Sequence, residues 1–215
     1  MTKIKICGIK TIPDALAAIE AGADLLGFNF YPKSQRYIEP VACSKITAIL
    51  REKHPAVTLV GVFVNSPTNE IRTILETAHL HLAQLHGDET PEMVAELQPD
   101  AFKAIRLKSD AGTDFAADNR ISDPIRFFVS QSAPLSAPAL LVDASAPGLY
   151  GGSGVTADWD AAAALARRVP ILLAGGLTPE NVAEAIARVQ PWGVDTASGV
   201  ESAPGVKDPA KMQAF

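Results

Sequence analysis

The sequence places a thiol and a carboxyl at the ends of two apolar segments, where both could transfer protons. Cys7 closes the segment "KIKIC" and precedes a glycine, and Asp143 closes "ALLVD". An ordinary thiol is only about 3% ionised at neutral pH, so a catalytic cysteine needs help to act as a base. A carboxyl acts as an acid only where its surroundings keep it protonated. The alternatives are an inert buried cysteine and a structurally hydrogen-bonded aspartate.

Three further polar residues lie in or beside loops that follow apolar segments. Arg36 lies in "YPKSQRYI", His86 in "QLHGDE" and Asp195 in "WGVDTAS". We predict that all three bind a substrate. A solvated cation at Arg36, a structural histidine and a loop-capping aspartate are the alternatives. Cys43 falls within the helix-like "EPVACSKITAIL" and is expected to be structural.

Eight short apolar segments, each followed by a helix-like segment, must position these residues. They are "KIKIC", "DLLGFNF", "TLVGVFV", "LHLAQLH", "FKAIRL", "ALLVD", "PILLAG" and "WGVDTAS". Strands that are buried on both faces carry such bursts of Val, Ile, Leu and Phe. The alternation predicts a parallel sheet covered by helices. Eight units fit a single (β/α)8 TIM barrel over residues 1–215, with an open doubly wound sheet as the alternative.

Proline pairs mark where several helices should begin. Thr178 with Pro179, Thr90 with Pro91 and Ser66 with Pro67 each read as an N-cap followed by a first helical residue. A further helix is expected from Pro13 to a terminating glycine at Gly22. Between Lys108 and Pro138 we predict a helix without defined ends and then a loop, although "IRFFV" fits a strand equally well.

In a (β/α)8 barrel the ends of the strands and the loops after them form one rim, which carries the catalytic side chains. The candidates named above all fall on that rim. Two glycine-containing loops, "AGGLTPEN" and "ASGVESAPG", follow the seventh and eighth strands, where such barrels often bind phosphate. We therefore predict a phosphate site at Gly175, Gly176, Ser198 and Gly199, with tight turns as the alternative. The loop "PGLYGGSG" is expected to form a lid, or else an ordinary surface loop.

Composition limits the classes of function. The 215 residues carry a net charge of −5 without a basic cluster, which argues against nucleic-acid binding. No apolar run approaches the roughly 20 residues of a membrane span, and the charged start indicates no signal peptide. Two cysteines fit a reducing compartment. We expect a cytoplasmic protein that binds a small molecule, as a monomer or a homodimer.

The residues together resemble the phosphoribosylanthranilate isomerase family of tryptophan biosynthesis. The matching stretches are "KICGIKT", "GADLLGFNFYPKSQRYI", "VGVFVN", "QLHGDE", "LLVDASAPGLYGGSG", "LLAGGLTPENV" and "VDTASGVESAPGVKDPAKM". They cover nearly the whole chain in order, apart from residues 108–138. The resemblance implies a (β/α)8 fold and an Amadori rearrangement of N-(5′-phosphoribosyl)anthranilate to 1-(o-carboxyphenylamino)-1-deoxyribulose 5-phosphate.

By that resemblance Cys7 is the general base, Asp143 is the general acid and Arg36 binds the anthranilate carboxylate. No metal or organic cofactor is implied. A positive charge near Cys7 would favour its thiolate, and the sequence does not show which residue supplies it. The alternative functions are a related sugar-phosphate isomerase, acting for example on a histidine-pathway aminoaldose, and a non-catalytic barrel that binds a phosphorylated ligand.

Four positions depart from the family pattern. Gln35 stands where proline is common, Ser153 where threonine is frequent, Ala157 in place of an aromatic residue, and Ala197 in place of a serine. Changes at Ala157 and Ala197 would weaken lid packing or a phosphate contact. They do not alter the proposed acid–base pair.

Overall fold

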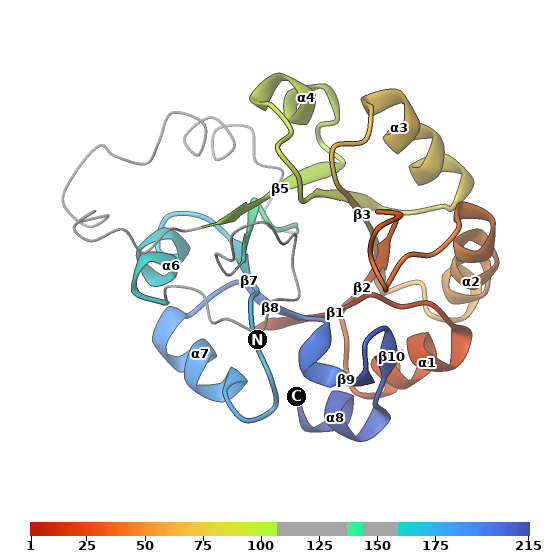
Figure 1. The fold of residues 1–215 in the computed structure, drawn as a ribbon. Helices are drawn as coiled ribbons and strands as arrows, with labels where there is room; N and C mark the ends of the chain where they lie inside the picture. The colour runs from red at the N-terminus through yellow and green to blue at the C-terminus, as the bar shows by residue number, and fades with distance from the viewer. Residues whose placement is uncertain (107–136, 144–158) are drawn as a thin grey trace.

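The computed structural model describes residues 1–106, 137–143 and 159–215, and in these segments eight parallel strands close into a barrel (Figure 1). Each strand pairs with the next in chain order, and the last pairs with the first through Ile4 and Val194. The strands are β1 Lys3–Cys7, β2 Leu25–Asn29, β3 Thr58–Phe63, β4 Leu82–Leu85, β5 Ala101–Arg106, β6 Leu140–Asp143, β7 Ile171–Leu173 and β8 Gly193–Thr196. The predicted closed barrel is confirmed, because β1 and β8 pair with each other and an open sheet would lack that pairing.

Helices surround the barrel on its outside (Figure 1). They are α1 Ile12–Glu20, α2 Pro40–Lys53, α3 Thr68–Thr77, α4 Pro91–Glu96, α6 Trp159–Ala166, α7 Val182–Val189 and α8 Pro209–Ala214. Among the described residues, no helix is both long and apolar enough to cross a membrane. The segment 107–136 and the loop "PGLYGGSG" lie outside the described residues, as do Ser153 and Ala157. The prediction of a single domain stays a prediction.

The strands bury side chains on both faces, as the apolar segments predict. In β1, Ile4 and Ile6 contact the main core between barrel and helices. Lys5 and Cys7 point the other way because side chains alternate along a strand. A second, smaller apolar cluster fills the barrel and is formed by Leu25, Val60, Phe102, Ala104, Leu141, Leu172 and Ala174.

The predicted start of α4 is confirmed in full, and that of α1 is confirmed to within one residue. Thr90 caps α4, whose first residue is Pro91, with its side-chain oxygen accepting from Met93 N. Helix α1 begins at Ile12 rather than at Pro13, because the Thr11 side chain already caps the backbone N–H of Asp14. The predicted terminating glycine lies directly after the C-cap and has φ +99°.

Two other helix starts were wrong. Helix α7 begins at Val182, not at Pro179, because Asn181 folds back on the preceding turn: its amide oxygen accepts from Thr178 N and its amide nitrogen donates to Gly176 O, both at 2.9 Å. Helix α3 begins at Thr68, with Pro67 rather than Ser66 as its N-cap. In both cases the helix starts later than the proline pair indicates.

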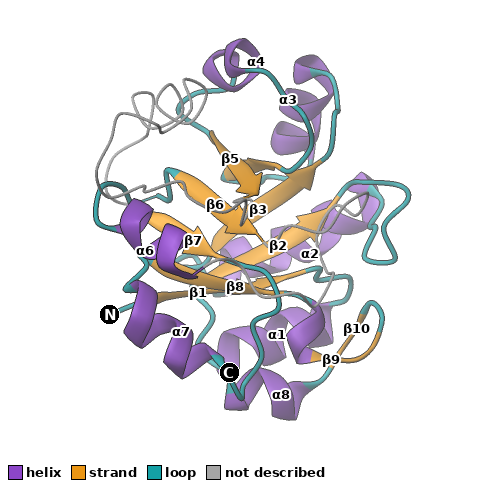
Figure 2. Cartoon of the chain, turned by 60° about the vertical axis from the view of Figure 1, so that its left-hand side comes forward, coloured by secondary structure: helices purple, strands orange, loops and turns teal. Residues whose placement is uncertain are grey.

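The chain ends in elements that the sequence analysis did not predict. After β8 come a short 3-10 helix, η1 Ser198–Val200, and an antiparallel hairpin of β9 Glu201–Ala203 and β10 Val206–Lys207. Helix α8 packs against α1, and the hairpin lies beside both helices in the two views (Figure 2). The C-terminal segment thereby carries Glu201 and Lys207 to the rim of the barrel.

Candidate active site

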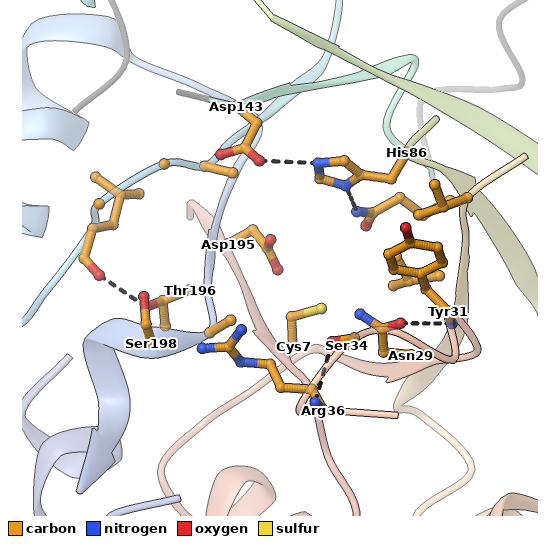
Figure 3. A pocket seen from close by; sticks show the side chains of 18 residues that line it. Cys7, Asn29, Tyr31, Ser34, Arg36, His86, Asp143, Asp195, Thr196 and Ser198 are labelled. Atoms are coloured by element: carbon orange, nitrogen blue, oxygen red, sulfur yellow. Dashed lines mark hydrogen bonds and ion pairs between the residues drawn. The ribbon is translucent and has the colours of Figure 1, made fainter. Parts of the chain in front are cut away.

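A pocket opens at the carboxyl ends of the strands, and most of the predicted site residues line it (Figure 3). Those that line it are Cys7, Arg36, His86, Asp143, Gly175, Gly176, Asp195 and Ser198. Gly199 is not among the lining residues. Tertiary folding has therefore brought together residues from both ends of the chain, as expected for the rim of a (β/α)8 barrel.

Cys7 and Asp143 lie on opposite sides of this pocket, with Asp195 between them (Figure 3). Cys7 is the last residue of β1 and Asp143 the last residue of β6, and both are buried. A ligand in the pocket would therefore lie between a thiol and a carboxyl. The geometry permits an acid and a base to act on two sides of one small molecule.

A positive charge lies next to the thiol. Lys5 is fully buried inside the barrel, and its Nζ is 2.8 Å from Asp195 Oδ1. Burial raises the pKa of Cys7 above its ordinary value, and Lys5 opposes that rise more strongly than any other charge. Burial alone would lower the pKa of Lys5, but Asp195 and Cys7 outweigh it and raise that pKa, so the lysine is charged.

The sequence analysis missed Lys5, although a signal was present. Lys5 precedes Cys7 by two residues, and alternation along a strand puts residues two apart on the same face. A lysine that points into a barrel needs a buried partner. That partner, Asp195, is 190 residues away in the chain. Among the residues that the structure describes, the partner of Asp195 is thus a lysine and not a loop amide.

Asp143 is bonded to a histidine from the neighbouring part of the rim. The distance from His86 Nε2 to Asp143 Oδ2 is 2.9 Å, and the distance from His86 Nδ1 to Gln84 Nε2 is also 2.9 Å. With the Gln84 amide donating to Nδ1, the imidazole carries its proton on Nε2 and donates it to the carboxyl. The chain from Gln84 through His86 fixes the orientation of Asp143.

Arg36 is held by the C-terminal hairpin. Its Nε and Nη2 donate to Glu201 Oε1 and Oε2, both at 2.8 Å, and Lys207 Nζ lies 3.0 Å from Oε1. This bond to Glu201 raises the pKa of Arg36. Burial alone would raise the pKa of Glu201, but the two cations together lower it. Arg36 is thus paired and largely buried, which excludes the solvated loop cation that the sequence left open.

The two glycine loops are joined to each other. Gly175 and Gly176 have φ of +90° and +67°, so the chain turns sharply after β7. The hydroxyl of Thr196 donates to Leu177 O at 2.8 Å, and a Cβ on Gly199 would clash with that same carbonyl oxygen. Gly199 therefore permits the close approach of the loops and does not itself face the pocket.

Two departures from the family pattern fall within the described residues. Ala197 lines the pocket, and its carbonyl oxygen accepts from Lys207 Nζ at 2.9 Å. The carbonyl of Gln35 accepts from Lys10 Nζ at 3.2 Å. At both positions the contact is made by a backbone carbonyl oxygen. It therefore does not depend on which side chain stands there.

The barrel and its rim pocket define the class: a (β/α)8 protein with a buried thiol, a carboxyl, an arginine and two joined glycine loops at the carboxyl ends of its strands. Residues 4–215 match the family model described as N-(5'phosphoribosyl)anthranilate (PRA) isomerase. The chain belongs to this family of isomerases.

Individual relatives agree with the family model. A Geotalea uraniireducens N-(5'-phosphoribosyl)anthranilate isomerase is 44% identical over 215 residues, which cover 100% of this chain and 97% of that protein. The crystal structure of phosphoribosyl anthranilate isomerase from Thermotoga maritima matches with a TM-score of 0.81 and 35% identity, over 100% of this chain and 97% of that one. A further structure of the isomerase, in complex with reduced 1-(o-carboxyphenylamino)-1-deoxyribulose 5-phosphate, matches with a TM-score of 0.77 and 33% identity, over 100% of this chain and 96% of that one.

Proposed function

We propose that the chain catalyses the Amadori rearrangement of N-(5′-phosphoribosyl)anthranilate in tryptophan biosynthesis, with Cys7 as the general base and Asp143 as the general acid. The observation that carries the assignment of roles is that these two buried residues lie on opposite sides of one pocket, which Arg36 also lines. Family membership favours this reaction over a related aminoaldose isomerisation and over ligand binding without catalysis.

The reaction needs one proton delivered and one removed. Asp143 gives a proton to the furanose ring oxygen, the bond from that oxygen to C1′ breaks, and the anilino nitrogen supplies the electron pair that forms the Schiff base. The Cys7 thiolate then takes the proton from C2′, and the electrons of that C–H bond form an enolamine. Proton transfer from the C2′ hydroxyl and to C1′ gives the ketone. A thiol and a carboxyl on opposite sides of the sugar can serve both steps.

His86 supports the acid in this scheme. A carboxyl that must deliver its proton to one ring oxygen needs a fixed direction, and the bond from His86 Nε2 provides it. We assign His86 to positioning Asp143, which refines the expectation that it binds substrate. Asp195 uses Oδ1 for Lys5. Because its carboxylate also lines the pocket, we assign its remaining oxygen to a ribose hydroxyl.

Arg36 is assigned to the anthranilate carboxylate. The Nε and Nη2 edge of its guanidinium is taken by Glu201, and the Nη1 edge is the one that we assign to the ligand. A planar arginine fixed on one edge presents its other donors without further loss of side-chain freedom. The carboxylate end of the substrate would then lie on the side of Cys7, since Cys7 is close enough to Arg36 to raise the pKa of the guanidinium.

The phosphate of the substrate is assigned to the loops of Gly175, Gly176, Ser198 and Gly199. Successive backbone N–H groups in left-handed turns form concave anion sites, and the turn at Gly175 and Gly176 is of this kind. The loop after β8 meets this turn where Thr196 donates to Leu177 O. Gly199 contributes by letting the loops approach. A cytoplasmic location, and the choice between a monomer and a homodimer, stay predictions of the sequence.

The test is the decay of phosphoribosylanthranilate fluorescence on addition of the purified chain. We expect turnover by the unmodified protein, and loss of most turnover with retained substrate binding in Cys7→Ser and in Asp143→Asn. Cys43→Ser is the matched control, because this second buried cysteine lies in α2, outside the pocket. Full activity of Cys7→Ser would refute the assigned base. Turnover of an aminoaldose phosphate alone would refute the substrate.

A further inference from the structure

Lys5 is a buried charge that the steps above do not use. Its side chain is 0% exposed, and it forms an ion pair with Asp195 inside the barrel. A buried ion pair is costly to desolvate, and apolar residues of similar volume often serve stability as well. A contribution to folding therefore does not by itself account for a lysine at this position.

The position of Lys5 relative to the thiol is set by a glycine. Gly27 of β2 pairs in register with Cys7. A Cβ on Gly27 would stand 2.8 Å from Cys7 Sγ and 3.1 Å from Lys5 Nζ. Both atoms therefore occupy the space that this missing side chain leaves, and the ammonium and the thiol lie next to each other within the barrel.

We propose that Lys5 is a positioning residue for the rearrangement proposed above: its ammonium, anchored by Asp195, stabilises the thiolate of Cys7 from inside the barrel. The proposal rests on the proposed function, in which that thiolate is the base. Lys5 does not line the pocket, so it acts through Cys7 and not on the substrate. It supplies the positive charge that the sequence left unassigned.

Within the described segments, four charged groups act on Cys7 or are affected by it. Burial, the largest effect, raises the pKa of the thiol, Lys5 of β1 lowers it, Asp195 of β8 raises it, and Lys207 of β10 lowers it. Arg36, from the loop after β2, is the fourth charged group. Lys5 has the strongest effect of the four. Removing its charge must therefore raise the pKa of Cys7 further, and the thiolate would then form only at higher pH.

The experiment measures the thiol directly and does not require turnover. In a Cys43→Ala background Cys7 is the single thiol of the chain. The rate of its alkylation by iodoacetamide is followed against pH for Lys5→Met, and kcat/KM is followed over the same range. The matched control is Lys103→Met, which removes another buried lysine, paired with Glu89, that does not face Cys7.

In Lys5→Met we expect the midpoints of both pH profiles to move to higher pH, with alkylation about tenfold slower at neutral pH. Both rates should recover as the pH rises, while Lys103→Met keeps the original midpoints. An alkylation midpoint in Lys5→Met equal to that of Lys103→Met would overturn the proposal. If the unmodified chain fails to isomerise, the proposed function is wrong, but the alkylation profile still tests the role of Lys5 toward the thiol.

A second variant covers the case in which Lys5→Met does not fold because Asp195 is left buried without its cation. Lys5→Met with Asp195→Asn removes both charges. Because Lys5 affects Cys7 more than Asp195 does, the alkylation midpoint should still rise, by less than in the single variant. An unchanged or lower midpoint in the double variant would contradict the proposal.

Discussion

Arg36 and Glu201 form a two-pronged ion pair, with both N–O distances at 2.8 Å, across 165 residues of sequence. Glu201 opens the hairpin that follows η1, whereas Arg36 belongs to the loop after β2. The hairpin therefore holds in place Arg36, the residue that we assign to the substrate carboxylate. Its role in binding can be tested without changing Arg36 itself.

Glu201→Gln should weaken substrate binding. The neutral amide accepts only one of the two bonds from Arg36 and leaves Lys207 without its carboxylate, so the guanidinium is no longer fixed. We expect KM to rise about tenfold with a smaller change in kcat, measured by steady-state fluorescence kinetics. Glu89→Gln is the control, since it removes another buried, lysine-paired glutamate. A fall in kcat alone would contradict this role.

Gly8→Ala should also displace Arg36, because Gly8 packs against its side chain. Gly8 has φ +82°, and a Cβ there would lie 2.6 Å from Arg36 Cδ. Gly22→Ala is the matched control: its φ is +99°, but nothing lies within 4 Å of the added Cβ.

Both glycine variants should lose about 1–2 kcal/mol of unfolding free energy in urea, because both force alanine into a left-handed conformation. Only Gly8→Ala should also raise KM, because only there does the new methyl group displace the arginine. Equal KM values for the two variants would show that the packing of Arg36 on Gly8 has no effect on binding.

His86→Ala should lower kcat. The change leaves Asp143 without the bond from Nε2, so its carboxyl loses the fixed direction toward the ring oxygen. We expect kcat to fall at least tenfold, with a smaller change in KM. The control is His79→Asn, an exposed histidine after α3. If His86→Ala raised KM alone, a direct contact with the substrate would be the better assignment.

Cys43 should make stability depend on pH in the alkaline range. Burial raises the pKa of this thiol from 9.0 to about 12. The neutral thiol is thus favoured in the folded state. Its contribution to stability is complete below the unfolded pKa and is lost as the pH rises from about 9 toward about 12, by at most about 1.4 kcal/mol per pH unit.

Urea unfolding of the reduced chain between about pH 8 and about pH 10.5 tests this prediction. Cys43→Ala should be less stable at the lower pH because it leaves a small cavity in the core. Its stability should fall less steeply with pH, since the thiol no longer titrates. Parallel pH curves for the two proteins would mean that Cys43 is not buried in the folded state.

Local sequence patterns determined the elements and the edge of the barrel at which the candidate site lies. Eight apolar segments, each a few residues long, predicted the strands, and Cys7 and Asp143 were recognisable because each ends such a segment. Capping signals are also local: Thr90 with Pro91 marked a helix start correctly. They failed at Thr178, because the competing partner was the Asn181 side chain, which folds back onto the turn before it.

Only the tertiary structure decided which charges meet. Closing the barrel brings β8 beside β1 and so pairs Asp195 with Lys5, and the hairpin brings Glu201 to Arg36. The physical reason is that periodicity and capping act over a few residues, whereas a buried charge takes whichever opposite charge the folded chain places within a few ångströms. The sequence thus named the thiol, the carboxyl and the arginine, and the fold supplied their neighbours: Lys5 beside Cys7, His86 bonded to Asp143, and Glu201 bonded to Arg36.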